Sequence, residues 1–227
     1  FNNEQIIEAA LLSLKIAATS ATFATILGTM AGLALTQMGR YRGRLVFTGI
    51  IAAPLVMPEV ITGLSLLLMF VSLQELIGWP VSRGASTITI AHITFSMAYV
   101  AVVVQSRLSS MDQSLHEAAM DLGGRPMQVA FDITLPLIAP SMLSGWLLAF
   151  TLSLDDLVIA SFTSGAGAST LPMVIFSKIK LGVTPDINAL ATLIIGTVSM
   201  GIIIASLIMF RQNKLNKAVS YTHLRAH

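Results

Sequence analysis

The sequence predicts an all-α integral membrane protein, and three observations support this prediction. Apolar residues make up 55% of the 227 residues and charged residues only 11%. The mean hydropathy is +0.81. The charged residues gather in short clusters between long apolar runs, whereas a soluble domain spreads its charges over a hydrated surface. Because a helix of about 20 apolar residues crosses the hydrocarbon core, we expect this chain to span a bilayer several times.

Five apolar runs are long enough to be expected as membrane spans: 9–35, 45–73, 88–104, 137–162 and 189–210. The first contains Gly28 and Gly32, whose spacing would let another helix approach closely. The second is longer than one straight span requires. Pro54 and Pro58 are therefore expected to bend or interrupt it, because proline removes a hydrogen bond from a helix.

Lysine and arginine predict how the spans are oriented. Eight of them fall in segments 40–44, 105–135 and 211–217, and only Arg83, Lys178 and Lys180 flank the other ends of the spans. Because basic residues favour the cytoplasmic side, segment 105–135 is expected in the cytoplasm and the start of the chain outside. An outside start would fit a preceding span that is missing. Residues 1–219 are expected to form one transmembrane domain, and 220–227 a non-native tail.

The predicted cytoplasmic segment contains the pattern of a short amphipathic helix. Ser114 and Glu117 have the spacing of a capping box, which predicts Ser114 as the N-cap. Gly123 is expected to end this helix and Pro126 to begin the next one. Four small or apolar residues then share one face: Leu115, Ala118, Ala119 and Leu122. Such a face is suited to docking against another protein.

The same segment resembles a motif of a known family. Glu117-Ala118-Ala119 is followed by Gly123 and, after nine further residues, by Ile133-Thr134-Leu135-Pro136. This pattern is similar to the EAA loop in permease subunits of binding-protein-dependent ABC importers, where the loop forms a coupling helix that sits in a cleft of the cytoplasmic ATPase. The resemblance implies an ATPase contact formed by Glu117, Ala118, Ala119, Asp121 and Gly123. It also implies that Leu135 and Pro136 lead back into the fourth span.

The wider resemblance covers most of the chain and is strongest to permeases of spermidine/putrescine importers. It is carried by segments 53–63, 150–156 and 187–192. It implies a type I ABC importer permease fold of six spans, with five present here, in the bacterial cytoplasmic (inner) membrane. The implied partners are a second permease subunit (a paralogue or the same chain), an external substrate-binding protein and an ABC ATPase that uses ATP and Mg. Permeases for iron, sulfate or thiamine share the EAA loop and remain alternatives.

Three carboxylates within the predicted spans are candidates for the substrate path: Glu59, Asp155 and Asp156. A charge inside a bilayer is costly, so such groups usually face the bundle interior or an aqueous path and have a partner. Adjacent helical residues point about 100° apart, so Asp155 and Asp156 cannot both face one lumen. The alternative role is structural, with Glu59 satisfying backbone groups freed by Pro58 and Asp155 capping a segment after a helix break.

Other classes of protein are disfavoured by what the sequence lacks. It has no cysteine, no His-Glu-x-x-His or Gly-x-Ser-x-Gly motif, and no lysine that follows a glycine. We therefore expect no catalytic residues, no cofactor or metal ion bound to this chain, and no nucleic-acid partner. His92 is expected to be hydrogen-bonded within the bundle. An ion-coupled secondary transporter would explain the acidic spans but not the EAA pattern.

Overall fold

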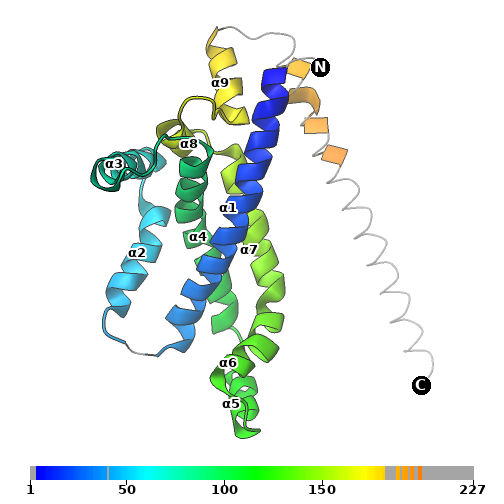
Figure 1. Cartoon of the computed structure of the whole chain (residues 1–227). Coiled ribbons are helices and arrows are strands. Elements are labelled where there is room, and N and C mark those ends of the chain that lie inside the picture. The colour runs from blue at the N-terminus through cyan, green and yellow to red at the C-terminus, as the bar shows by residue number, and fades with distance from the viewer. Residues whose placement is uncertain are drawn as a thin grey trace, which may run out of the picture. The chain divides into compact units, whose positions relative to one another are not determined.

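The computed structural model describes residues 4–39 and 41–181, with short helical pieces at 188–189, 191–193, 195–196 and 199–200. Every regular element in these residues is helical (Figure 1). Residues 2–174 form one compact unit, and residues 175–227 with residue 1 form another. The predicted span 189–210 lies outside the described residues except for those short pieces, and the expected tail 220–227 lies wholly outside them.

The described elements follow one another along the chain as nine α-helices and one π-helix: α1 Glu4–Gln37, α2 Arg44–Val56, α3 Glu59–Ile77, α4 Ala85–Ser109, α5 Gln113–Asp121, α6 Pro126–Val129, η1 Ala130–Thr134, α7 Leu135–Asp155, α8 Val158–Thr163 and α9 Leu171–Leu181. Four stretches among the described residues are long and apolar enough to cross a membrane: Glu4–Gln37, Glu59–Ile77, Ala85–Ser109 and Pro126–Asp155. Residues 9–35 and 88–104, predicted as the first and third spans, lie within α1 and α4.

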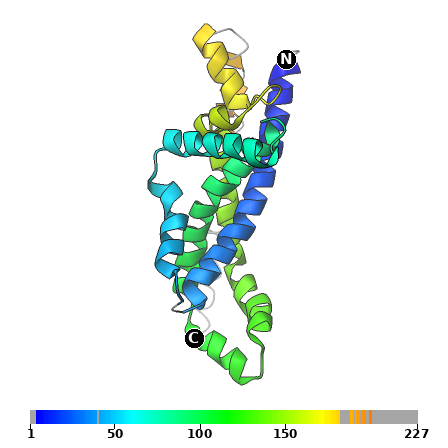
Figure 2. The same ribbon diagram turned by 60° about the vertical axis from the view of Figure 1, so that its left-hand side comes forward.

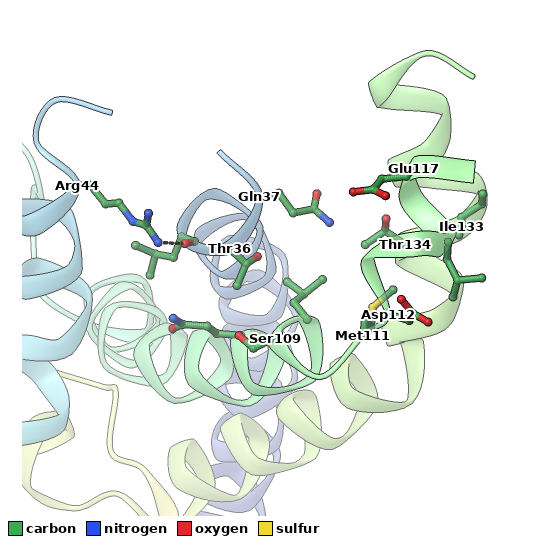
Figure 3. A pocket seen from close by; sticks show the side chains of 13 residues that line it. Thr36, Gln37, Arg44, Ser109, Met111, Asp112, Glu117, Ile133 and Thr134 are labelled. Carbon is green, nitrogen blue, oxygen red and sulfur yellow. Dashed lines mark hydrogen bonds between the residues drawn. The ribbon is translucent and has the colours of Figure 1, made fainter. Parts of the chain in front are cut away.

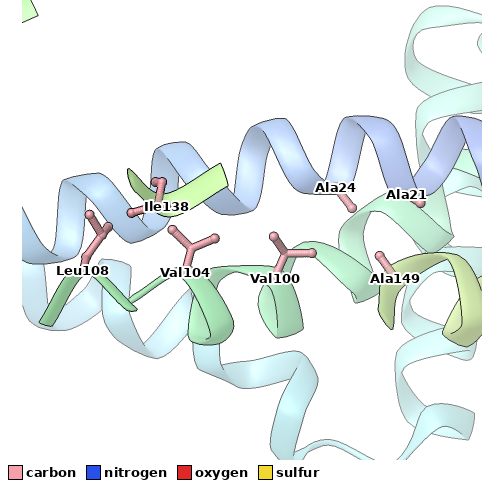
Figure 4. Close-up of a cluster of buried hydrophobic side chains, with 7 residues drawn as sticks. All are labelled: Ala21, Ala24, Val100, Val104, Leu108, Ile138 and Ala149. Atoms are coloured by element: carbon pink, nitrogen blue, oxygen red, sulfur yellow. The ribbon is translucent and has the colours of Figure 1, made fainter. Parts of the chain in front are cut away.

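The core of the larger unit is formed by α1, α4 and α7, which lie side by side (Figures 1 and 2). Their shared apolar cluster is shown in Figure 4 and consists of Ala21, Ala24, Val100, Val104, Leu108, Ile138 and Ala149. The small residues of α1 bring its backbone close to α4, as the glycine spacing predicted. A Cβ atom on Gly28 would lie 2.7 Å from Cβ of Val100, and one on Gly32 would lie 3.1 Å from Cγ1 of Val104.

The second predicted span, 45–73, is divided into two helices, and the predicted interruption at Pro58 is confirmed. Met57 and Pro58 are extended, with ψ angles of 136° and 138°, and separate α2 from α3. The proline ring disfavours helical backbone at the residue before it, which explains why the break falls at Met57. Pro54 does not interrupt the chain and lies inside α2. Figure 2 shows α3 running across the long axis of α1, and α2 alone has 13 residues, about 20 Å of helix.

The fourth predicted span, 137–162, is shifted toward the N-terminus. Helix runs without a break from Pro126 to Asp155. Its segment Ala130–Thr134 is π-helical and directly precedes Leu135 and Pro136 at the start of α7. The wider π-turn accommodates the ring and the missing N–H of the proline within a continuous helix. The helix ends at Asp155, so the predicted end at residue 162 is wrong, and α8 begins after a turn at Asp156.

Candidate functional site

Helix α5 begins with Asp112 as its N-cap. The Asp112 carboxylate accepts a hydrogen bond of 3.0 Å from the backbone N–H of Ser114, and Asp112 itself is extended. The predicted N-cap, Ser114, is therefore wrong by two residues, because the carboxylate reaches the second amide of the helix first. The hydrogen bond from the Ser114 N–H, with a smaller contribution from its hydroxyl, lowers the pKa of Asp112. The Asp112-Gln113-Ser114 sequence could have predicted this N-cap, because aspartate is a preferred N-cap residue.

The predicted C-terminal end of α5 is confirmed at the glycine pair. Gly123 adopts a left-handed conformation, with φ at 87°. Its N–H donates to the carbonyl of Met120 at 2.9 Å, and the Gly124 N–H donates to the carbonyl of Ala119 at 3.0 Å, which together form a Schellman motif. A Cβ at Gly124 would lie 2.8 Å from the Ala119 oxygen. Pro126 begins α6, as predicted.

Most of the residues predicted to contact another protein are exposed on α5 or directly after it. Leu115 is 48% exposed, Met120 40% and Leu122 90%. Ala118 is also exposed, whereas Ala119 is half-buried. The carboxylates Glu117 and Asp121 are exposed as well. A short helix with a fixed start and end thus presents apolar side chains that nothing in residues 4–39 and 41–174 covers fully.

A polar pocket of about 510 Å³ lies beside α5 (Figure 3). It is lined by residues from the end of α1, from the basic segment 40–44 and from segment 105–135: Leu35, Thr36, Gln37, Arg44, Gln105, Leu108, Ser109, Met111, Asp112, Leu115, Glu117, Ile133 and Thr134. The Arg44 guanidinium donates to the carbonyls of Leu35 at 2.7 Å and Gly39 at 2.9 Å, which satisfies the end of α1. The two basic segments therefore share one end of the bundle, as the orientation argument requires.

The three intramembrane acids occupy different environments. Glu59 is exposed in the first turn of α3, and Asp155 is exposed at the end of α7. Asp156 is 8% exposed and accepts hydrogen bonds from the N–H groups of Ile159 at 3.3 Å and Ala160 at 2.7 Å. The two adjacent aspartates therefore have different surroundings, with Asp155 exposed and Asp156 buried. The residue that caps the helix after the break is Asp156, where the structural alternative had named Asp155.

The predicted hydrogen bonding of His92 is also confirmed. Its Nε2 lies 3.2 Å from Oδ2 of Asp156, and its Nδ1 lies 2.6 Å from Oγ of Ser153. Ser153 is bonded in turn to Oγ of Ser20 at 2.9 Å. Sequence reasoning found His92 and Asp156 separately and missed that they form a pair. No spacing rule joins two residues 64 positions apart.

Comparisons with known proteins identify the family to which this chain belongs. Residues 24–219 match the model of the family described as "binding-protein-dependent transport system inner membrane component". The chain is 62% identical over 203 residues to the putrescine transport system permease protein PotI of Escherichia coli K12, covering 89% of this chain and 72% of that protein. It is 41% identical over 213 residues to the spermidine/putrescine transport system permease protein PotC of Haemophilus influenzae, covering 94% and 80%.

Solved structures show the same fold at low sequence identity. A bacterial ABC transporter that imports alginate matches with a TM-score of 0.72 at 19% identity, covering 93% of this chain and 81% of that one. The methionine ABC transporter MetNI in an inward-facing conformation matches with a TM-score of 0.70 at 16% identity, covering 86% and 90%. The fold is therefore that of ABC importer permeases. This chain belongs to the family of inner membrane components of binding-protein-dependent transport systems, as a membrane-spanning permease subunit and not as an enzyme.

Proposed function

We propose that this chain carries polyamines, with putrescine as the principal substrate, across the bacterial cytoplasmic membrane. The observation that carries the proposal is the 62% identity to a putrescine permease along 89% of the chain. The more distant relative, named for both spermidine and putrescine, belongs to the same substrate class. Both relatives are named for polyamines, and neither for the competing substrates iron, sulfate or thiamine.

The proposed coupling element is α5. In this role Glu117, Ala118, Ala119, Asp121 and Gly123 contact a cytoplasmic ABC ATPase, which binds ATP and Mg. The exposure of Leu115 and Leu122 supports this role, because an uncovered apolar surface on a short helix favours docking. Leu135 and Pro136 support it too, since continuous helix joins them to Pro126 near the end of the loop. A second permease subunit and an external binding protein complete the proposed complex.

The proposed substrate path passes Glu59 and Asp155. A linear diamine carries two ammonium groups, and each needs a carboxylate or equivalent acceptor when it loses water. Both carboxylates are exposed on their helices, which leaves them available to a cation. Asp156 contributes differently, because its carboxylate is already bonded to two backbone N–H groups and to His92. In our proposal Asp156 fixes the geometry of the path, and Asp155 meets the substrate.

Uptake of labelled putrescine and spermidine tests the proposal in cells that lack their own importers and co-express the partner subunits. Glu117→Lys should abolish uptake and co-purification with the ATPase, whereas the matched control Asp132→Lys, also an exposed carboxylate near the loop, should not. Asp155→Asn should lower uptake more than Glu75→Gln, which removes an exposed charge elsewhere on a helix. Assembly without any polyamine uptake would reject the substrate but keep the permease; failure to bind an ATPase would reject the proposed coupling.

A further inference from the structure

We infer that His92 is a positioning residue for substrate passage, which holds helix α8 in place through Asp156 and thereby sets the positions of Asp155 and Glu59. The inference rests on the proposed function for its account of the two outer acids. His92 lies within α4 and is 1% exposed. A buried imidazole on a membrane-spanning helix needs partners for both ring nitrogens, and this one has them.

The hydrogen bonds around His92 form one chain through three helices. Oγ of Ser20 in α1 lies 2.9 Å from Oγ of Ser153 in α7, which lies 2.6 Å from Nδ1 of His92. Nε2 of His92 lies 3.2 Å from Oδ2 of Asp156. Both ring nitrogens therefore have a partner, Nε2 the Asp156 carboxylate and Nδ1 the Ser153 hydroxyl. The ring is thereby fixed in orientation as well as in place.

Asp156 transmits this orientation to α8. Its carboxylate accepts hydrogen bonds from two N–H groups in the first turn of α8, those of Ile159 and Ala160. At the other end of the same helix, the Thr87 hydroxyl at the start of α4 donates to the carbonyl of Thr163 at 2.7 Å. The six residues of α8 are thus joined to α4 at both ends. Because so short a helix is not stable alone, these bonds determine where it lies.

Helix α8 in turn packs against α3. A Cβ on Gly63 would lie 2.7 Å from Cδ2 of Phe162 and 3.4 Å from Cα of Ile159, so the two helices are in direct contact. Glu59 lies one helical turn before Gly63, and Asp155 directly precedes Asp156 in the chain. Glu59 therefore lies on the helix that packs against α8, and Asp155 lies next to the residue that caps α8. A displacement of α8 changes the position of both.

Removal of the imidazole leaves a buried carboxylate without its side-chain partner. Such a carboxylate turns toward water or takes up a proton, and either change weakens its bonds to Ile159 and Ala160. The start of α8 then frays, while the apolar core of α1, α4 and α7 and the α5 region are left as they are. The expected defect is therefore in passage of the substrate and not in engagement of the ATPase.

The first experiment measures putrescine imported per ATP hydrolysed by the assembled transporter in proteoliposomes with loaded binding protein. His92→Ala should lower this ratio about tenfold, and His92→Gln should restore most of it by donating to Asp156. Ser96→Ala, a buried polar residue one turn along α4 whose hydroxyl has no hydrogen-bond partner, should leave the ratio unchanged. The double variant His92→Ala with Asp156→Asn should lower this ratio little more than Asp156→Asn alone does, because both substitutions remove the same hydrogen bond.

A second measurement does not depend on the substrate. The sequence contains no cysteine, so Ile159→Cys introduces a single thiol at the buried start of α8. In the assembled transporter, adding His92→Ala should raise the rate of its modification by a soluble thiol reagent about tenfold, and adding Ser96→Ala should not. Uptake and ATP hydrolysis falling in equal proportion, or an unchanged modification rate, would overturn the inference. If the wild-type transporter imports no polyamine, the proposed function fails and the modification rate alone decides the role of His92.

Discussion

Gly28 of α1 lies against Val100 of α4 with no room for a side chain between them. A Cβ on Gly28 would lie 2.7 Å from Cβ of Val100 and 2.8 Å from the carbonyl oxygen of Met97. Neither obstacle is the free end of a flexible side chain, so a rotamer change cannot relieve the contact. The close approach of these two helices therefore depends on glycine at this position.

Gly28→Ala is expected to destabilise the protein by about 2 kcal/mol, because an added methyl group in a filled core forces the helices apart. The midpoint of thermal unfolding of the purified transporter should fall. Gly49→Ala is the matched control: Gly49 lies inside α2 with nothing within 4 Å of the position of a Cβ. An equal fall in both variants would show that the contact between α1 and α4 does not matter.

Gly123→Ala should weaken the end of α5, because an alanine at φ near 87° is strained by about 1–2 kcal/mol. The expected result is a lower rate of ATP hydrolysis stimulated by the binding protein. Gly78→Ala introduces the same kind of strain, at φ of 73°, at the end of α3. Stimulation that falls equally in the two variants would contradict a specific role for the end of α5.

The N-cap of α5 should depend on pH in a defined direction. The pKa of Asp112 in the folded helix lies below its ordinary value of 3.8. A lowered pKa means that the cap contributes fully above about pH 3.8 and is lost as the pH falls through the folded value. Amide exchange protection at Ser114, corrected for the intrinsic rate, should fall in strong acid. Asp112→Asn, which can cap without titrating, should remove this dependence; a dependence that survives would assign it to another group.

Substitution of the two adjacent aspartates should change the stability of the protein by different amounts. Asp156→Ala leaves the N–H groups of Ile159 and Ala160 and the ring of His92 without their buried acceptor, so a loss of about 1–3 kcal/mol is expected. Asp155→Ala removes an exposed side chain and should change stability little. Thermal unfolding of the two variants, side by side, checks this. Equal destabilisation would mean that the environments of the two residues are misassigned.

The parts of the fold that were predicted correctly depend on local pattern. Apolar runs long enough to span a bilayer located α1 and α4, and the glycine at 123 located the end of α5. The break at Pro58 was anticipated because proline acts on its own neighbours. The prediction failed where distant residues decide the outcome. Helix α7 stops at Asp155, and the next residue, Asp156, bonds to His92 on another helix; no local pattern carries the information that these two residues meet.

The candidate site shows the same division. The resemblance to the EAA loop identified Glu117, Ala118, Ala119 and Gly123 as one element, and the structure places them on or directly after α5. Spacing could not show that Arg44 bonds to the end of α1 and lines the same pocket as Glu117. It also gave equal weight to Asp155 and Asp156. Only the packing of α4 and α8 around one of them distinguishes a bonded carboxylate from an available one.

The unbroken helix from Pro126 to Asp155 has a mechanical consequence. Its 30 residues measure about 45 Å along the axis, so it joins the turn after α5 directly to the acid at the far end. A helix resists twisting about its own axis far better than a loop does, and torque applied at Pro126 arrives at Asp155 as rotation. The π-helical turn Ala130–Thr134 contains one residue more than an α-helical turn. It therefore sets the direction in which Asp155 points relative to Pro126, viewed along the helix axis. An insertion or deletion there would turn Asp155 by about 100° without moving it along the axis by more than about 1.5 Å.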